Sequence, residues 1–305
     1  MSKLPATFGK IVNAAVEELL DPARKAEWIK TMYRSKVLVL KGLHNLTATQ
    51  LWDIHAVFGT PWEQKEYWQS FEKAVETEPD SGKFVTEYSN VLTATRIGDK
   101  SLPWHHDIPW HRARRYPIRS LYPTLLKGGA GSVTTNFCDC DVVWSRLPKD
   151  QWNKLAEADI RLQFWYDASK GVSNPRTRVV PLVERHPHTQ RYSVLLNSFG
   201  PTEQNKNIPE LPFSTVSTGA WAIDCWSRNE RLGLKYLDEL HKLVVTEDNI
   251  YEHEWEMGDL VLFDNYSGVF HGRDKIKVEG AERAFWRMNV KHYWQPTTST
   301  AELTE

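Results

Sequence analysis

The chain has 305 residues, of which 41% are hydrophobic and 25% are charged. These fractions are close to the averages of globular proteins, so they exclude the disordered and fibrous classes. The 38 lysine and arginine residues nearly balance the 39 aspartate and glutamate residues, and the resulting net charge of −1 argues against a general nucleic-acid binder.

The N-terminal part of the chain predicts helices over residues 8–34. Glu17 and Glu18 interrupt its apolar positions, which is typical of an amphipathic helix and not of the apolar centre of a secretory signal. Asp21 and Pro22 form a suitable N-cap and first-turn pair, so a second helix is expected to begin there.

The next segments alternate between strand and helix patterns. Residues 36–41 predict a short buried strand. Thr47 begins a capping-box pattern, and the helix that follows is expected to end at Gly59. Residues 62–82 have no clear period and predict a loop with a short helix, whereas residues 84–96 alternate in character and predict a strand.

Short strand patterns, separated by Gly, Pro, Asn and Asp, dominate the rest of the chain. They fall at residues 120–126, 132–137, 161–166, 179–184, 192–197, 260–263 and 285–292. One more helix is expected over about residues 229–243, where leucines recur near the helical period. This pattern predicts a mainly β fold with flanking helices and a jelly-roll, or double-stranded β-helix, core. No linker or repeat divides the chain, so we expect one domain over residues 1–305.

The cysteines and the hydropathy pattern suggest a cellular location. Three cysteines (Cys138, Cys140 and Cys225) are too few for a disulfide framework, which favours a reducing compartment. No apolar run approaches the roughly 20 residues that span a bilayer. We therefore expect a cytoplasmic protein without a membrane or nucleic-acid partner, and leave open whether it forms a homo-oligomer.

A candidate metal site begins at the sequence Trp104-His105-His106-Asp107. Residues i and i+2 of a strand point to the same face, so His105 and Asp107 would lie together while His106 points away. They supply two ligands of a site with two histidines and one carboxylate, which leaves three positions on a metal ion open. The alternative for so short a pattern is a hydrogen-bonded pair at a strand end.

His271 is the candidate for the third ligand. It follows the buried strand pattern of residues 260–263, on a loop that could reach into the mouth of a barrel. A surface histidine is the alternative. His253 precedes the same strand at its opposite end, and His292 lies on the last predicted strand without a nearby carboxylate, so both are expected to be structural.

Arg283 and Arg287 follow His271 along the chain. A strand returning beside the His271 segment would place an arginine in the same cavity, where a guanidinium binds a carboxylate through two parallel hydrogen bonds. A pair of surface arginines is the alternative.

In this order, the segments resemble the taurine/2,4-D dioxygenase (TauD/TfdA-like) family of Fe(II)/2-oxoglutarate oxygenases. The likeness runs from about residue 36 to residue 294. The matching residues are 37–42, 58–59, 104–107, the glycine-rich turn 128–135, 183–189, 255–259, 264–265, His271, Arg283 and Arg287. The chain departs from the family in two places: the loop between Asp264 and His271 is one residue longer, and the turn lacks an acidic residue before its threonines.

The resemblance implies that His105, Asp107 and His271 hold Fe(II), with 2-oxoglutarate as cosubstrate and O2 as oxidant. The far carboxylate of 2-oxoglutarate would pair with Arg287 and contact Thr134, although Thr135 is also eligible. Arg283 would support this end or reach the nearer carboxylate. Related halogenases have a small residue in place of the aspartate, so the aspartate here implies that hydroxylation, not halogenation, is the default.

The implied reaction oxidises a C–H bond of a small molecule. The basic run 111–119 favours an anionic metabolite or an amino-acid-like natural product intermediate, with a solvated loop as the alternative. Desaturation or oxidative cyclisation would use the same chemistry. Candidates for the lining of the substrate pocket are Tyr67, Trp68, Tyr88, Asn90 and Trp110, with ordinary packing as the alternative.

Two other classes of function compete with the oxygenase. A zinc hydrolase also uses histidine and aspartate ligands with an open position, but it has no need for an arginine that binds a carboxylate. A non-catalytic jelly-roll binding protein would explain the fold and the many aromatic residues. Cys138 and Cys140 lack two further ligands for a second metal and are expected to be structural.

Overall fold

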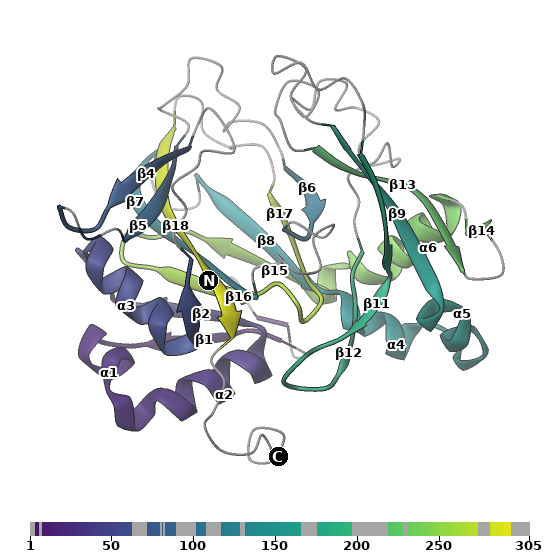
Figure 1. Cartoon of the computed structure of the whole chain (residues 1–305), viewed down its shortest axis with the longest axis horizontal. Helices are drawn as coiled ribbons and strands as arrows, with labels where there is room; N and C mark the ends of the chain where they lie inside the picture. Colours follow the sequence, from purple (N-terminus) through teal and green to yellow (C-terminus); the bar gives the residue numbers. More distant parts are fainter. Residues whose placement is uncertain are drawn as a thin grey trace.

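The computed structural model describes residues 4–5, 8–62, 72–79, 81, 83–89, 102–107, 117–128, 132–165, 176–196, 219–227, 231–232, 234–273 and 281–293. In this part of the chain, two β-sheets enclose an apolar core, and helices pack on their outer faces (Figure 1). This is the predicted jelly roll with flanking helices.

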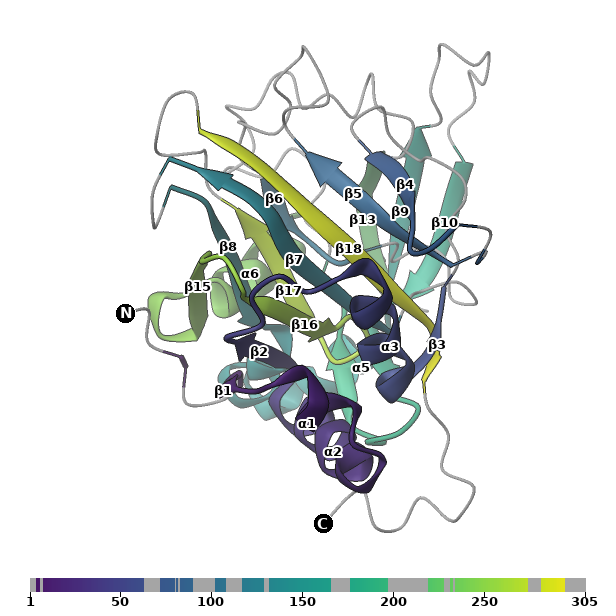
Figure 2. The ribbon, with the colours of Figure 1, turned by 90° about the vertical axis from the view of Figure 1, so that its left-hand side faces the viewer.

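The larger sheet has eight strands. Its order is β1 (Lys10–Asn13), β2 (Val37–Lys41), β16 (Leu260–Asp264), β7 (Ile118–Lys127), β18 (Glu282–Tyr293), β5 (Phe84–Ser89) and β4 (Glu72–Glu76), and β3 (Gly59–Pro61) pairs with β18. Only the β1–β2 pair among these is parallel. The long strands β7 and β18 run side by side through its centre (Figure 2).

The smaller facing sheet has four antiparallel strands. Its order is β15 (Ile250–Glu254), β8 (Thr134–Asp139), β17 (Val269–Arg273) and β6 (Leu102–His105). Two further antiparallel groups lie outside the jelly roll: β10 (Arg176–Pro181), β9 (Ala158–Trp165), β13 (Gly219–Ser227) and β14 (Arg231–Leu232), and the pair β11 (Val183–Arg185) and β12 (Tyr192–Val194).

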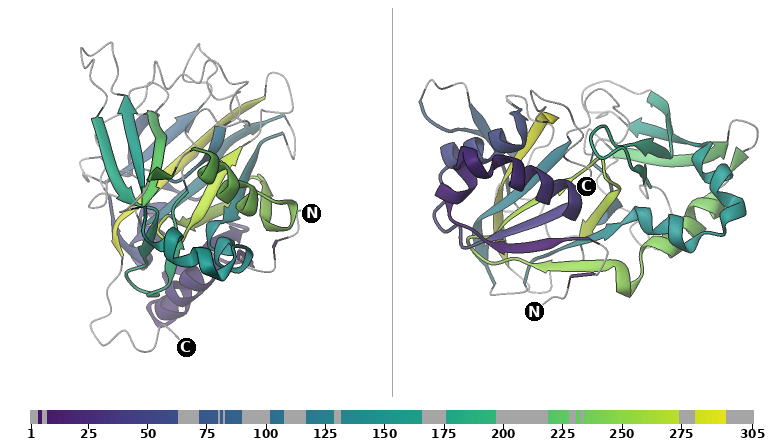
Figure 3. Two further views of the ribbon diagram at one scale, coloured as in Figure 1. Left: turned by 90° about the vertical axis from the view of Figure 1, so that its right-hand side faces the viewer. Right: turned by 90° about the horizontal axis from the view of Figure 1, so that it is seen from below.

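Helices cover the outer faces of both sheets. They are α1 (Val16–Leu20), α2 (Lys25–Ser35) and α3 (Ala48–Phe58) on the larger sheet, and α4 (Val143–Arg146), α5 (Trp152–Ala156) and α6 (Leu234–Val244) near the smaller one. Short 3-10 helices are η1 (Pro22–Arg24), η3 (Cys140–Val142), η4 (Lys149–Gln151) and η7 (Glu247–Asn249). Seen from below, the two helical groups lie at opposite ends of the molecule (Figure 3, right).

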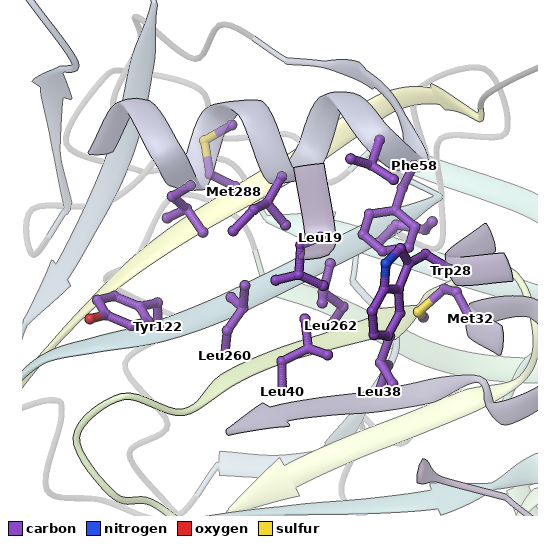
Figure 4. Packing of buried hydrophobic residues seen from close by; sticks show 14 of the residues in the cluster. Leu19, Trp28, Met32, Leu38, Leu40, Phe58, Tyr122, Leu260, Leu262 and Met288 are labelled. Carbon is purple, nitrogen blue, oxygen red and sulfur yellow. The ribbon is translucent and has the colours of Figure 1, made fainter. Parts of the chain in front are cut away.

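The alternation of β2 shows how the sequence builds these layers. Val37 and Val39 face the core between the sheets, whereas Leu38 and Leu40 face the N-terminal helices, and all four side chains are fully buried. A strand that is covered on both faces needs such a continuous apolar run. The leucines meet a helical layer that includes Leu19, Trp28, Met32 and Phe58 (Figure 4).

Several predicted elements are confirmed. Thr47 caps α3 with its side chain and forms a capping box with Gln50, and the helix ends at Gly59. Asp21 accepts a hydrogen bond from the main chain of Ala23 and so caps the turn before α2. The strand predicted over residues 36–41 is β2.

Other predictions are wrong in part. Residues 8–34 are not helical throughout, because Lys10–Asn13 form β1, whose main chain pairs in register with β2. Residues 62–82 contain the strand β4, which pairs with β5. The late helix begins at Leu234 instead of residue 229, since Arg231–Leu232 pair with β13. In each case the partner strand supplies main-chain hydrogen bonds that the local sequence pattern does not reveal.

A buried ionic cluster joins the end of α2 to the smaller sheet. The Nζ atom of Lys36 lies 2.9 Å from both carboxylate oxygens of Asp139 and 2.6 Å from Asp141. Burial opposes the charge of Lys36, but the two carboxylates outweigh it and raise the pKa of the amine. Burial and the neighbouring Asp139 raise the pKa of Asp141 to about 6, against the opposing effect of Lys36.

We predict that Lys36→Met lowers the free energy of unfolding by about 3–5 kcal/mol near pH 8, because it leaves two buried carboxylates without a cation. The loss should shrink towards pH 5. Lys36 lowers the pKa of Asp141, so its removal raises this pKa further. A carboxyl group whose pKa is raised in the folded state contributes stability below the unfolded pKa and loses that stability as the pH rises. Towards pH 5 the buried Asp141 of the variant therefore takes up a proton, and its missing cation matters less. Urea unfolding at the two pH values measures this difference. An equal loss at both would contradict the ionic account.

Candidate metal centre

The register between β6 and β17 brings two histidines together. His105 is the last residue of β6 and pairs with His271 of β17. Their ring centroids are 4.1 Å apart, and both side chains are buried. His271 therefore lies on a strand inside the jelly roll and not on the exit loop that its sequence position predicts, because β17 is held by β8 on its other side.

Asp107 completes the group. Its Oδ2 atom lies 3.3 Å from Nε2 of His271, and its Oδ1 atom lies 3.9 Å from Nε2 of His105. One ligand atom from each of the three residues lies within 4.8 Å of the others. No other set of three His, Cys, Asp or Glu residues in the described part of the chain meets this criterion. The structure thus brings together the three candidate ligands that the sequence predicts.

Arg119 is a neighbour of this group whose role the sequence prediction missed. It lies on β7 of the facing sheet, is 3% exposed, and places Nη1 2.5 Å from Oδ2 of Asp107. Burial by itself raises the pKa of Asp107, but Arg119, His271 and His105 outweigh it and hold the pKa well below its usual range. Asp107 is therefore ionised at neutral pH. The sequence places Arg119 directly before the strand predicted over residues 120–126, and only the start of β7 at Ile118 shows that it lies on a buried strand, where a charge needs a partner.

Arg283 and Arg287 lie on β18, which pairs with β7 and β5 and not with β17. They therefore do not sit beside the His271 strand, as the sequence predicts, but on the sheet that faces it. Alternation along β18 places Arg283 and Arg287 on the same face as Phe285, which packs in the core between the sheets. Arg283 is buried, and Arg287 pairs in register with the buried Thr86.

The two candidate threonines of β8 point to opposite faces. Phe137 pairs with His271 and packs in the core between the sheets, so Thr135 shares this inner face. Its hydroxyl accepts a hydrogen bond from the indole N–H of Trp255 at 2.9 Å. Thr134 faces outwards, on the side of Cys138, which packs towards α6.

The competing histidines have other partners. His106 points away from the triad and contacts Phe270 and the Sγ atom of Cys140. His253 lies on β15, where Nδ1 is hydrogen-bonded to the hydroxyl of Tyr251 at 2.7 Å and Nε2 lies 3.2 Å from Asp259. Both therefore lie outside the candidate metal site.

Cys138 and Cys140 are buried without a disulfide, which fits a structural role.

Other predictions fall on residues that the structure does not describe. The predicted pocket residues Tyr67, Trp68, Asn90 and Trp110, the side chains of Tyr88 and His292, and the basic residues Arg112, Arg114 and Arg115 lie outside the described residues.

Two imidazoles and one carboxylate at adjacent positions are the ligand set of mononuclear non-haem Fe(II) oxygenases. An ionised carboxylate and two imidazole groups offer ligand atoms that suit such an ion, so the residues present fit an Fe(II) centre. A jelly roll with this group between its sheets is typical of the class of mononuclear non-haem Fe(II) oxygenases.

The family comparison makes the assignment more specific. Residues 1–289 match the model of the family described as taurine catabolism dioxygenase TauD, TfdA family. The chain belongs to this family. It is a 2-oxoglutarate-dependent dioxygenase, an oxidoreductase that uses Fe(II), 2-oxoglutarate and O2. The zinc hydrolase and the non-catalytic binding protein are thereby set aside.

Solved structures share the fold. AAD-2, in a complex with Mn(II) and N-oxalylglycine, has a TM-score of 0.63 and 18% identity, with 97% of this chain and 98% of that chain covered. A protein from Burkholderia xenovorans assigned as an alpha-ketoglutarate-dependent taurine dioxygenase has a TM-score of 0.66 and 15% identity, with 98% and 95% covered. A taurine dioxygenase from the same organism has a TM-score of 0.63 and 14% identity, with 99% and 97% covered.

No curated protein sequence matches the chain. In the part of the chain that the structure describes, no helix is long and apolar enough to cross a membrane.

Proposed function

We propose that this dioxygenase oxidises a C–H bond of a small, polar, anionic metabolite or amino-acid-like intermediate at the triad of His105, Asp107 and His271, with hydroxylation as the outcome. The observation that carries the proposal is the convergence of these three ligand atoms within 4.8 Å between the sheets of a TauD/TfdA-family jelly roll. A cytoplasmic location and a single domain over residues 1–305 belong to the same proposal.

The three residues divide the work of metal binding. His105 and His271 donate imidazole nitrogens from paired strands, and Asp107 donates a carboxylate oxygen from the segment after β6. Arg119 contacts Oδ2 of Asp107 and would hold the carboxylate in place for a bound ion. A site with two histidines and one carboxylate would leave room on the ion for 2-oxoglutarate and O2.

Arg287 is proposed to bind the far carboxylate of 2-oxoglutarate, with Arg283 as the supporting residue. Both arise from the face of β18 that carries Phe285 into the core, so their side chains start on the same side as the triad. Of the two threonines that the sequence left open, the inward position favours Thr135 over Thr134 for the cosubstrate contact.

When bound, Fe(II), 2-oxoglutarate and O2 together supply oxidative decarboxylation of the cosubstrate coupled to oxidation of the substrate. The protein contributes orientation and an apolar wall. Phe137 and Phe263 flank His271, with ring centroids 6.2 Å and 4.8 Å away, and exclude water from that side. Because a carboxylate stands at position 107, the proposed site would leave chloride no vacant ligand position.

The charge of the substrate rests on the basic run after Asp107. Arg119 belongs to that run, but it is buried against Asp107 and so does not support an anionic substrate. The support that remains is the sequence of Arg112, Arg114 and Arg115. Desaturation or oxidative cyclisation is the second candidate reaction, since it needs the same site.

We predict that His271→Ala weakens Mn(II) binding by more than about tenfold. A loss of about tenfold is already typical when a residue that only hydrogen-bonds to a metal ligand is replaced, and His271 is itself a proposed ligand. Mn(II) replaces Fe(II) in this measurement because it is stable in air, and its binding is followed by electron paramagnetic resonance. His253→Ala is the matched control: a buried histidine of the same sheet that lies outside the triad. Equal losses in both variants would refute the assignment of His271.

Arg287→Lys is expected to weaken the binding of 2-oxoglutarate to the Mn(II)-loaded protein by about 1.5–3 kcal/mol, because lysine keeps the charge but loses the paired hydrogen bonds. Calorimetric titration measures the affinity. Thr135→Val and Thr134→Val form a matched pair in the same assay, and only the first should weaken binding. A larger loss in Arg283→Lys than in Arg287→Lys would exchange the roles of the two arginines.

The reaction itself is tested with Fe(II), ascorbate, 2-oxoglutarate and a panel of amino acids, sulfonates, other carboxylates and neutral analogues. Succinate release should rise with an anionic compound, whose product gains the mass of one oxygen. Loss of two hydrogens would select desaturation or cyclisation instead. Stimulation by neutral lipophilic compounds alone would reject the anionic substrate but keep the dioxygenase.

A further inference from the structure

Asp107 lies at a position that strand pairing does not hold. β6 ends at His105, and its register with β17 includes only Leu102 and His105. Asp107 is two residues further on, in a bend, and must still present its carboxylate to the two histidines. Some other contact has to fix its main chain.

Asn265 makes that contact. Its Nδ2 atom donates a hydrogen bond to the carbonyl oxygen of Asp107 at 2.7 Å, and its Oδ1 atom accepts one from the main-chain N–H of Asp107 at 3.1 Å. The amide thus occupies both backbone polar groups of Asp107, as a neighbouring strand would in a ladder. Asn265 is fully buried, so water does not compete for these two bonds.

The main chain on either side of Asn265 is itself fixed. The N–H of Asn265 donates to the carbonyl of Pro117, the N–H of Asp264 donates to the carbonyl of Lys36, and each distance is 2.8 Å. Ser267 donates its hydroxyl to the carbonyl of Asp264 at 3.0 Å. The corner that carries Asn265 is therefore tied to β7 and to the end of α2.

His186 holds the same corner from another side. Its Nε2 atom lies 2.9 Å from Oδ2 of Asp264, and both side chains are completely buried. Nδ1 of His186 accepts hydrogen bonds from the main-chain N–H groups of His188 and Thr189, so the ring hydrogen is on Nε2 and is donated to Asp264. The orientation of the corner is thus determined by side chains as well as by the main chain.

We propose that Asn265 is a positioning residue for the metal ligand Asp107. It fixes the main chain of Asp107, while Arg119 contacts the carboxylate, so that the carboxylate stays close to His105 and His271. The inference rests on the proposed metal triad. It adds a residue that contacts neither metal nor cosubstrate but determines where the aspartate ligand stands.

The test measures Mn(II) affinity of the metal-free protein without 2-oxoglutarate. Asn265→Ala should weaken binding about 10–100-fold, the range found when the hydrogen-bonded support of a metal ligand is removed. Ser267→Ala is the matched control, because it removes a buried hydrogen bond from the same corner without touching Asp107. It should change the affinity less than about threefold, well below that range.

A double-mutant cycle separates positioning from a general loss of structure. In an Asp107→Ala background the ligand side chain is gone, so adding Asn265→Ala should weaken Mn(II) binding no further. The same substitution should still lower the midpoint of thermal unfolding in both backgrounds. An equal weakening in both backgrounds would mean that Asn265 acts through the fold as a whole, and it would overturn the proposal.

Asn265→Gln covers the case in which the alanine variant does not fold. It keeps the buried amide but moves it by one methylene group, so it should also weaken Mn(II) binding by at least about tenfold. Wild-type affinity in either folded variant would overturn the role of Asn265 and would leave the proposed metal triad intact. If the wild-type protein does not bind Mn(II), or if His271→Ala binds it equally well, the proposed triad itself fails.

Discussion

The charge of Asp107 is the constraint around which the centre of this molecule is built. A carboxylate taken out of water costs several kcal/mol unless charges and hydrogen bonds compensate it. Arg119 meets one of its oxygens at 2.5 Å, and the imidazoles of His105 and His271 lie within 4 Å. Arg119 therefore keeps this carboxylate ionised, which is the form that binds a metal ion.

This arrangement requires two sheets that face each other. The smaller sheet contributes the histidines through the β6–β17 register, and the larger sheet contributes Arg119 from β7. Asn289 of β18 is buried and pairs in register with Arg119 of β7. Arg287 occupies the neighbouring inward position of β18. A polar row thus crosses the inner face of the larger sheet, opposite the triad and next to apolar walls such as Phe263.

The end of α2 ties the helical layer to the same centre. Lys36 has a positive φ of 61°, which turns the chain from the helix into β2. Its side chain joins Asp139 and Asp141 at the end of β8, while its carbonyl accepts the N–H of Asp264, next to Asn265. One residue therefore connects the layer of N-terminal helices, the smaller sheet and the corner that supports Asp107.

The sequence by itself determined the mainly β class, the capped helix at Thr47 and the identity of the three candidate ligands. These depend on local features: alternation along strands, capping patterns and a His-x-Asp motif with a later histidine. Local patterns could not reveal β1, β4 or the strand that carries His271, because main-chain pairing with partners far along the chain makes those strands.

Only the tertiary structure decided the surroundings of the triad. Arg119 reads in sequence as part of a surface basic run, and the choice between Thr134 and Thr135 depends on which face of β8 turns inwards. The contact of Asn265 with Asp107 joins residues 158 positions apart. The packing of the two sheets decides which side chains are buried, which face of a strand turns inwards and which distant residues form hydrogen bonds. The spacing of residues along the sequence does not reveal these features.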